Sequence, residues 1–121
     1  MFEPIEIGFK GESFTVPANQ VFGLIATIEN YITFGDLQIA LAGGGKNTAL
    51  AQAYAAAVRY AGGKATHDEV YCMMFDKDSP QNVKLVLSSI MSMMIPPDAI
   101  KKAEEEQKED DAEEGEKKPE A

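Results

Sequence analysis

The sequence predicts a mainly α protein: a small helical bundle of four to five helices, an N-terminal β-hairpin and a disordered acidic C-terminal tail. Three observations predict this fold class. Apolar and polar residues alternate near the N-terminus, as in half-buried strands. From residue 17 to residue 96 apolar residues recur every three or four positions, as on helices. Beyond residue 97 charged residues dominate, and Ile100 is the single large apolar residue.

These patterns predict one folded domain over residues 1–97, with the hairpin in residues 4–16 and the bundle in residues 17–96, and a tail over residues 98–121. The hairpin is expected to turn at Lys10-Gly11-Glu12, where the alternation breaks. The alternating apolar residues are Ile5, Ile7 and Phe9, then Phe14 and Val16.

The first helix is expected to open at Pro17 or Asn19 and to stop near Phe34. Its apolar residues have the helical spacing i, i+3, i+4, i+7: Val21, Leu24, Ile25, Ile28 and Ile32. Asp36 is suited to cap a short second helix. The run Gly43-Gly44-Gly45 has too much backbone entropy to remain helical, so a flexible loop is expected there.

An alanine-rich third helix is expected to be capped by Asn47 or Thr48 and to end at Gly62-Gly63. It carries one narrow stripe of mostly small residues: Leu50, Tyr54, Ala57, Val58 and Ala61. Thr66 and Glu69 have the spacing of a capping box, which predicts a short fourth helix. That helix is expected to direct Val70, Met73 and Met74 toward the core.

The fifth helix is expected to start at Ser79-Pro80, because the missing proline N–H costs nothing in the first turn. It should end at Pro96-Pro97. Its apolar face comprises Val83, Val86, Leu87, Ile90, Met91 and Met94.

The charge and the cysteine count exclude several classes of function. The chain has 121 residues, a formal net charge of −9, a pI near 4.5 and one arginine, Arg59. Nucleic-acid binding is therefore not expected, because it depends on clustered Lys and Arg. The single cysteine cannot form an internal disulfide, which favours a reducing compartment. No signal peptide or membrane span is recognised, so we expect a cytoplasmic protein that does not bind membranes.

No catalytic, cofactor or metal site is predicted. The segment from Gly43 to Thr48 departs from a phosphate-binding loop, because Ala40 stands where the first glycine should be and Asn47 replaces the required Ser or Thr. His67 and Cys72 are too few ligands for zinc, and we interpret them as a solvated histidine and a small buried hydrophobe. Asp76 and Asp78 lack the ligand pattern of a calcium loop.

Methionine content suggests a surface that binds a protein partner. Five of the six methionines lie between residues 73 and 94, and thioethers adapt to varied partners. We predict Met91, Met93 and Met94 as partner-binding residues, with Met93 the most exposed because it lies off the apolar stripe. The alternative is that Met73, Met91 and Met94 fill an irregular core, which is the commoner use of such residues.

The segment from Phe14 to Phe75 resembles the tail assembly chaperones of long-tailed (siphovirus-type) bacteriophages and of gene transfer agents. A β start precedes the helix, and an alanine-rich helix follows it. The residues that carry the resemblance are Phe22-Gly23-Leu24-Ile25-Ala26-Thr27-Ile28-Glu29, Ala61-Gly62-Gly63 and Thr66-His67-Asp68-Glu69-Val70.

This resemblance implies a non-enzymatic protein of the cytoplasm of the infected bacterial host that is not retained in the mature virion. It would bind the tape measure protein and help recruit tail tube subunits. Such chaperones are often made in two forms, the longer by a programmed frameshift, for which Glu116-Lys117-Lys118 provides a possible slippery site. The alternatives are a small acidic secretion-type chaperone and a structural tail or connector protein of the virion.

Overall fold

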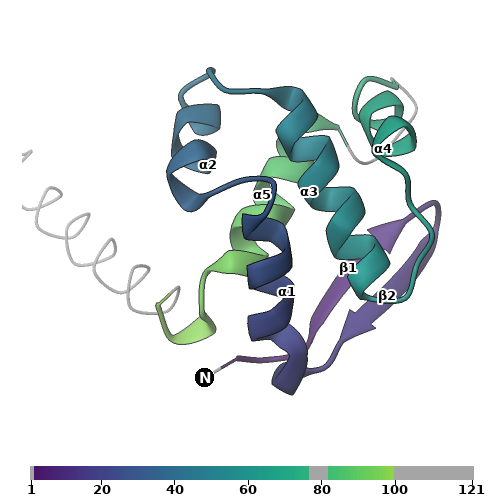
Figure 1. The fold of residues 1–121 in the computed structure, drawn as a ribbon, viewed down its shortest axis with the longest axis vertical. Coiled ribbons are helices and arrows are strands. Elements are labelled where there is room, and N and C mark those ends of the chain that lie inside the picture. The colour runs from purple at the N-terminus through teal and green to yellow at the C-terminus, as the bar shows by residue number, and fades with distance from the viewer. Residues whose placement is uncertain (1, 77–81, 100–121) are drawn as a thin grey trace, which may run out of the picture.

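The computed structural model of the chain describes residues 2–76 and 82–99, and it confirms a mainly helical fold with an N-terminal hairpin (Figure 1). Its elements are β1 (Ile5–Phe9), β2 (Glu12–Val16), the 3-10 helix η1 (Ala18–Gln20), α1 (Val21–Glu29), α2 (Phe34–Leu41), α3 (Asn47–Tyr60), α4 (His67–Met74) and α5 (Val83–Met94). A further helical turn begins after Pro96, whose carbonyl accepts a hydrogen bond from the Ala99 N–H at 3.0 Å. The predicted tail lies outside the described residues from residue 100 onward.

The hairpin turns where the sequence predicts. β1 and β2 are antiparallel, with Ile7 opposite Phe14, and Lys10 and Gly11 connect them. Both turn residues have positive φ, 51° and 77°, as the tight turns that match strand twist require. One face of the hairpin packs on the bundle and buries Ile7, Phe9 and Val16.

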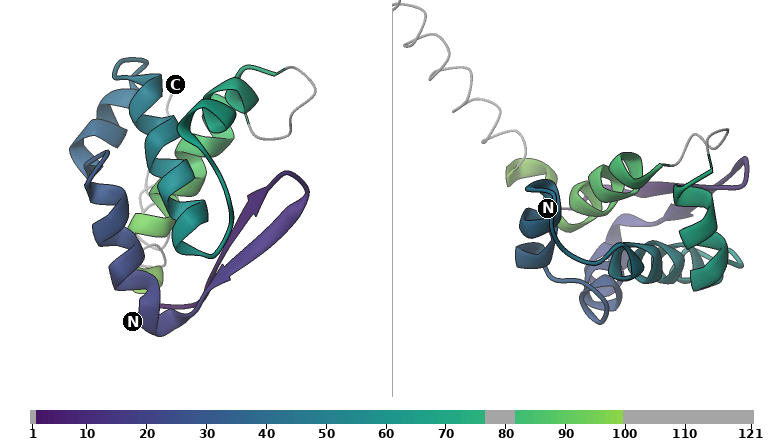
Figure 2. Two further views of the ribbon diagram at one scale, coloured as in Figure 1. Left: turned by 45° about the vertical axis from the view of Figure 1, so that its right-hand side comes forward. Right: turned by 90° about the horizontal axis from the view of Figure 1, so that it is seen from above.

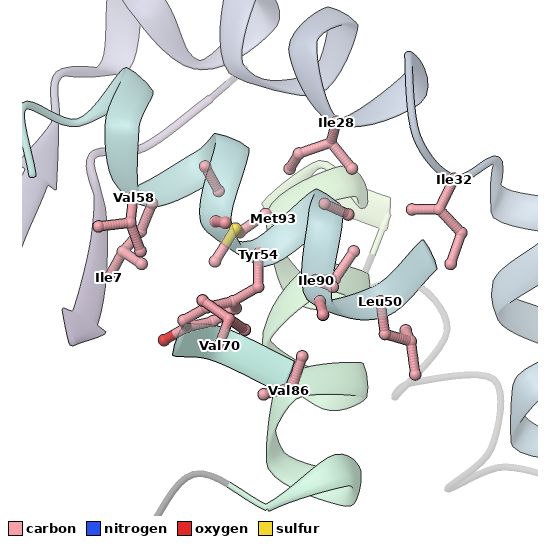
Figure 3. Close-up of a cluster of buried hydrophobic side chains, with 14 of the residues drawn as sticks. Ile7, Ile28, Ile32, Leu50, Tyr54, Val58, Val70, Val86, Ile90 and Met93 are labelled. Atoms are coloured by element: carbon pink, nitrogen blue, oxygen red, sulfur yellow. The ribbon is translucent and has the colours of Figure 1, made fainter. Parts of the chain in front are cut away.

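α3 is the central helix, and it contacts α1, α4, α5 and β1. Figure 3 shows side chains of these elements, such as Ile28, Val70 and Ile90, around Tyr54. The prediction of one narrow stripe on this helix is wrong, because the neighbouring elements cover most of its circumference. Its buried residues are Leu50, Ala51, Ala53, Tyr54, Ala55, Ala56, Ala57 and Val58. The many alanines let the surrounding helices approach closely.

Two predicted helix starts and one predicted helix end differ from the structure. α1 ends at Glu29, short of Phe34. The N-cap of α2 is Thr33, and Asp36 is the third helical residue of a capping box with it, with hydrogen bonds of 3.0 and 3.1 Å. The N-cap of α3 is Lys46, without a side-chain hydrogen bond. The N-cap residues of α2 and α3 therefore lie one to three positions before the predicted ones.

The starts of α4 and α5 depend on side-chain caps. The Thr66 hydroxyl accepts a hydrogen bond from the Glu69 N–H at 3.2 Å, so the predicted cap of α4 is confirmed. α5 begins at Val83, where the Asn82 side chain accepts from the Leu85 N–H at 3.1 Å. The predicted start at Ser79-Pro80 lies outside the described residues.

Glycines end α2 and α3 in the same way. Gly43 and Gly62 have φ of 94° and 102°. At the end of α3 the Gly62 N–H donates to the Arg59 carbonyl at 3.1 Å and the Gly63 N–H to the Val58 carbonyl at 2.9 Å. This pair of bonds is a Schellman motif, which satisfies helix-end carbonyls and favours glycine at the left-handed position.

Candidate functional site

The methionines of α5 do not form the exposed surface that the sequence predicts. Met93 is only 4% exposed, and Met91 and Met94 are half-buried. Met93 follows Val86 by seven residues, nearly two helical turns, so the two side chains share one face. Figure 3 shows Met93 close to Tyr54 of α3. The prediction that Met93 is the most exposed of the three is wrong.

A shallow hollow of about 210 Å³ borders Met93. The segment before β1, the start of α1 and the end of α5 line it, through Phe2, Ile5, Val21, Met93, Ile95 and Pro97. Met93 therefore contributes to the wall of a hollow rather than to a raised patch. Met91 and Met94 pack against the core cluster from its edge.

Large apolar side chains are exposed elsewhere on the molecule, one of them on α5 itself. They are Phe22, Phe34, Ile39, Leu41, Tyr60, Tyr71, Phe75 and Leu85. On α4, Tyr71 is 38% exposed and Phe75, which caps the helix, is 54% exposed. Their ring centres lie 5.1 Å apart, so the two rings form one surface, here called the α4 aromatic patch. Paired exposed rings make this surface a candidate for contact with another molecule.

Sequence reasoning missed the α4 aromatic patch. It followed the buried face of α4, where Val70 and Met74 are four residues apart and buried. Tyr71 and Phe75 have the same i, i+4 spacing one position later. This second spacing could have revealed the patch, because helix residues outside the buried stripe face solvent.

A hollow of about 480 Å³ adjoins the patch, between α3 and α4. Its lining residues are Thr48, Ala51 and Gln52 from α3 and His67, Asp68, Tyr71 and Cys72 from α4. Tyr71 belongs to both the patch and the hollow. Ala51 is the one fully buried residue of this lining, and its side chain is small. The surface therefore combines an aromatic rim with a depression, as grooves that bind partner helices do.

His67 is partly exposed, and neighbouring side chains also hold it. Its Nε2 atom lies 3.2 Å from Nη2 of Arg59, whose Nη1 donates to the Ala65 carbonyl at 2.8 Å. A guanidinium has only donors, so in this contact His67 Nε2 is the acceptor. The Tyr31 ring meets the imidazole edge-on, with centroids 5.6 Å apart. His67 thus joins α4 to α3 and to the segment after α1.

Cys72 is exposed, so its prediction as a buried hydrophobe is wrong. It lines the same hollow as His67, yet the described interactions of His67 are with Arg59 and Tyr31. Within residues 2–76 and 82–99, no three His, Cys, Asp or Glu side chains are grouped closely enough to hold a metal ion.

An ion pair fixes the start of α4 to the hairpin. The Lys10 ammonium donates to the Glu69 carboxylate, and the Thr66 hydroxyl donates to the other carboxylate oxygen at 3.1 Å. The hydrogen bond from Lys10, and then that from Thr66, lowers the pKa of Glu69 below its ordinary value. At neutral pH this carboxylate is therefore charged and joins two elements that lie far apart in the sequence.

The glycine run between α2 and α3 forms a helix end. The Gly43 N–H donates to the Ala40 carbonyl and the Gly44 N–H to the Ile39 carbonyl, both at 3.0 Å. These bonds are a second Schellman motif, and Gly45 follows with φ of 83°. The segment thus connects two helices, as predicted, whereas a phosphate-binding loop follows a strand.

Comparison with protein-family models, with curated protein sequences and with solved structures finds no match to this chain. Among the helices that the structure describes, none has both the length and the apolar character needed to cross a bilayer.

Proposed function

We propose that this protein is a tail assembly chaperone of a long-tailed bacteriophage or gene transfer agent. In this role it binds the tape measure protein and helps recruit tail tube subunits in the cytoplasm of the infected bacterial host. It is not an enzyme, it needs no cofactor, and it is not retained in the mature virion. A longer frameshifted form of the same chain is a further expected partner in assembly.

The order of elements supports this proposal. The sequence resemblance calls for a β start, a helix containing residues 22–29, an alanine-rich helix ending at Gly62-Gly63 and a helix capped by Thr66. The chain folds with these elements in this order, with residues 22–29 in α1, α3 ending at Tyr60 just before the glycines, and Thr66 as the N-cap of α4. Other small helical proteins share such an order, so it supports the fold part of the resemblance more strongly than the function.

The observation that carries the proposal is the α4 aromatic patch beside the α3–α4 hollow. A tape measure protein is a long helical chain with apolar stripes, and it must be covered before the tail tube forms around it. Tyr71 and Phe75 offer exposed aromatic surface, and the hollow of about 480 Å³ offers space for a side chain from a facing helix. The negative charge of the chain keeps such a complex soluble.

The test is affinity purification of the tagged full chain from phage-producing cells, with mass spectrometry of the bound proteins and of purified virions. The proposal expects the tape measure protein in the bound fraction and this chain absent from virions. Presence of the chain in virions in stoichiometric amount would identify a structural tail or connector protein. Recovery of an exported effector would identify a secretion-type chaperone.

A variant pair locates the binding surface. Tyr71→Ser with Phe75→Ser removes the α4 aromatic patch without altering a buried residue, and should lower tape measure recovery at least tenfold. Phe22→Ser is the matched control, because Phe22 is 72% exposed on α1, away from α4. Equal recovery with both variants would show that the patch is not the binding surface. Met91→Ser with Met94→Ser tests the sequence-predicted residues in the same assay.

A further inference from the structure

The two edges of the hairpin have different surroundings. β1 lies against α3, and the carbonyl of Gly8 accepts a hydrogen bond from the Tyr54 hydroxyl of that helix. β2 forms the other edge, where Ser13 and Thr15 are exposed. Figure 2 shows the hairpin running beside the helices, and Lys10 of its turn contacts Glu69 of α4. The edge of β2 is therefore accessible to another strand.

The turn determines which backbone groups of β2 point outward. A two-residue turn makes its flanking residues, Phe9 and Glu12, a hydrogen-bonded pair, and such pairs alternate along an antiparallel ladder. Phe14 then bonds to β1, whereas the N–H and C=O groups of Ser13 and Thr15 point away from it. In the part of the chain that the structure describes, no hydrogen bond reaches these outward groups.

Three common protections of an edge strand are missing from β2. Natural edge strands often carry lysine, proline or a bulge that prevents pairing with another chain. The sequence Glu12–Val16 contains neither lysine nor proline, and its five pairs with β1 follow without a bulge. Glu12, opposite the buried Phe9, is the one charged residue of the strand. An edge with exposed donors and acceptors is a template for a further strand.

We infer that β2 pairs antiparallel with β2 of a second copy of this chain, across a two-fold axis that passes beside Phe14. In this register Ser13 lies opposite Thr15 of the second copy, and each pair makes two backbone hydrogen bonds. The two hairpins form a continuous four-stranded sheet. A two-fold axis moved by one residue toward the end of β2 would pair Ser13 with Pro17, which has no N–H.

The side chains of β2 are self-complementary in this register. Phe14 faces Phe14 of the second copy, and aromatic side chains form favourable cross-strand pairs. Glu12, the one charged residue of β2, faces Val16 of the second copy, so no like charges are opposed. Phe14 is half-buried, packs against the core cluster and borders a hollow of about 330 Å³ with Gly62 and Gly63. Two-fold pairing requires such self-complementarity, which an unrelated strand would not need.

Sedimentation equilibrium of the full chain tests this inference first. We expect a reversible monomer–dimer equilibrium. Thr15→Pro removes one outward N–H from each copy without removing a hydrogen bond to β1, and should raise the dimer dissociation constant about 30-fold, as the loss of two hydrogen bonds predicts. Thr15→Val keeps the N–H and should leave the dissociation constant within about threefold. A wild-type chain that remains monomeric at all concentrations overturns the inference without any variant.

Cross-linking tests the register. In a Cys72→Ser background, Phe14→Cys should form a disulfide-linked dimer on oxidation, because facing residues at a non-hydrogen-bonded position have Cα atoms about 4.5 Å apart, within disulfide range. Ser13→Cys is the control, since residue 13 faces residue 15 rather than itself. Equal cross-linking of both variants overturns the register. Neither experiment contains another protein, so their outcome is independent of the proposed chaperone function.

Discussion

At the scale of single residues, small differences in position along a helix decide which side chains form the core. Met93 and Met94 are adjacent in the sequence, yet Met93 is 4% exposed and Met94 is half-buried. Consecutive helical residues differ by about 100° in direction, so two neighbouring methionines meet different surroundings. The buried one packs in the centre of the molecule, beside Tyr54 (Figure 3).

Replacing Met93 with alanine should therefore destabilise the fold more than replacing Met94. We expect Met93→Ala to lower the free energy of unfolding by about 2–5 kcal/mol, because it removes buried surface and leaves a cavity. Met94→Ala should cost less than half as much. Urea unfolding followed by circular dichroism measures both values. A larger loss for Met94→Ala would contradict the packing of α5 described above.

At the scale of elements, backbone hydrogen bonds close the ends of α2 and α3, and they require a positive φ that glycine adopts most easily. Gly62 has φ of 102° and no neighbouring atom within 4 Å of an added Cβ, so only its backbone conformation requires glycine. Gly35, in the first turn of α2, has no positive φ and only ordinary contacts around an added Cβ. An added Cβ meets no steric conflict at either position, so the two glycines differ only in backbone conformation.

We expect opposite effects of the same substitution at the two positions. Gly62→Ala should lower the free energy of unfolding by about 1–2 kcal/mol, because alanine is strained at a positive φ of this size. Gly35→Ala should raise it by about 0.4–1 kcal/mol, because it restricts the unfolded chain at no cost to the helix. Thermal unfolding of both variants checks the signs. Stabilisation by Gly62→Ala would show that the Schellman motif does not need glycine there.

The contact between the hairpin and α4 should depend on pH. The pKa of Glu69 is lowered in the folded chain by the hydrogen bonds from Lys10 and Thr66. Its contribution to stability is therefore complete above the unfolded pKa, for which the reference value is 4.5, and is lost as pH falls through the lower folded pKa. We expect Glu69→Gln to be less stable than the wild type at pH 7, with a difference that shrinks below about pH 4.5.

A double-mutant cycle assigns this effect to the pair. Lys10→Met and Glu69→Gln should each destabilise the chain at pH 7, and the double variant should lose less than the sum of the two. Chemical unfolding at pH 7 and pH 3 gives the four values needed at each pH. Additive losses at pH 7, or a coupling that does not decrease between pH 7 and pH 3, would contradict an ion pair between hairpin and helix.

At the scale of the whole molecule, local signals predicted the fold well, and tertiary contacts decided what the sequence could not predict. The hairpin turn and the Thr66 cap depend on neighbouring residues and were predicted correctly. The burial of Met93 and the exposure of Cys72 depend on which helices cover them, which periodicity alone does not specify. The candidate surface was missed for the same reason: the exposure of Tyr71 and Phe75 depends on which face of α4 packs against α3.

The core also predicts what the acidic tail contributes. Among residues 2–76 and 82–99, the buried cluster runs from Ile7 to Met93. Residues 100–121 carry ten acidic and five basic side chains, and we expect them to add charge rather than buried surface. A chain that ends after Ala99 should therefore keep its midpoint of thermal unfolding within about 2 °C, and should precipitate at lower concentration near neutral pH, because it loses net negative charge. Calorimetry and solubility measurements test both expectations. A full chain whose tail is replaced by a Gly/Ser segment of equal length separates charge from length: only loss of charge should lower solubility. A fall in the midpoint of more than about 5 °C on truncation would instead place part of the tail within the folded domain.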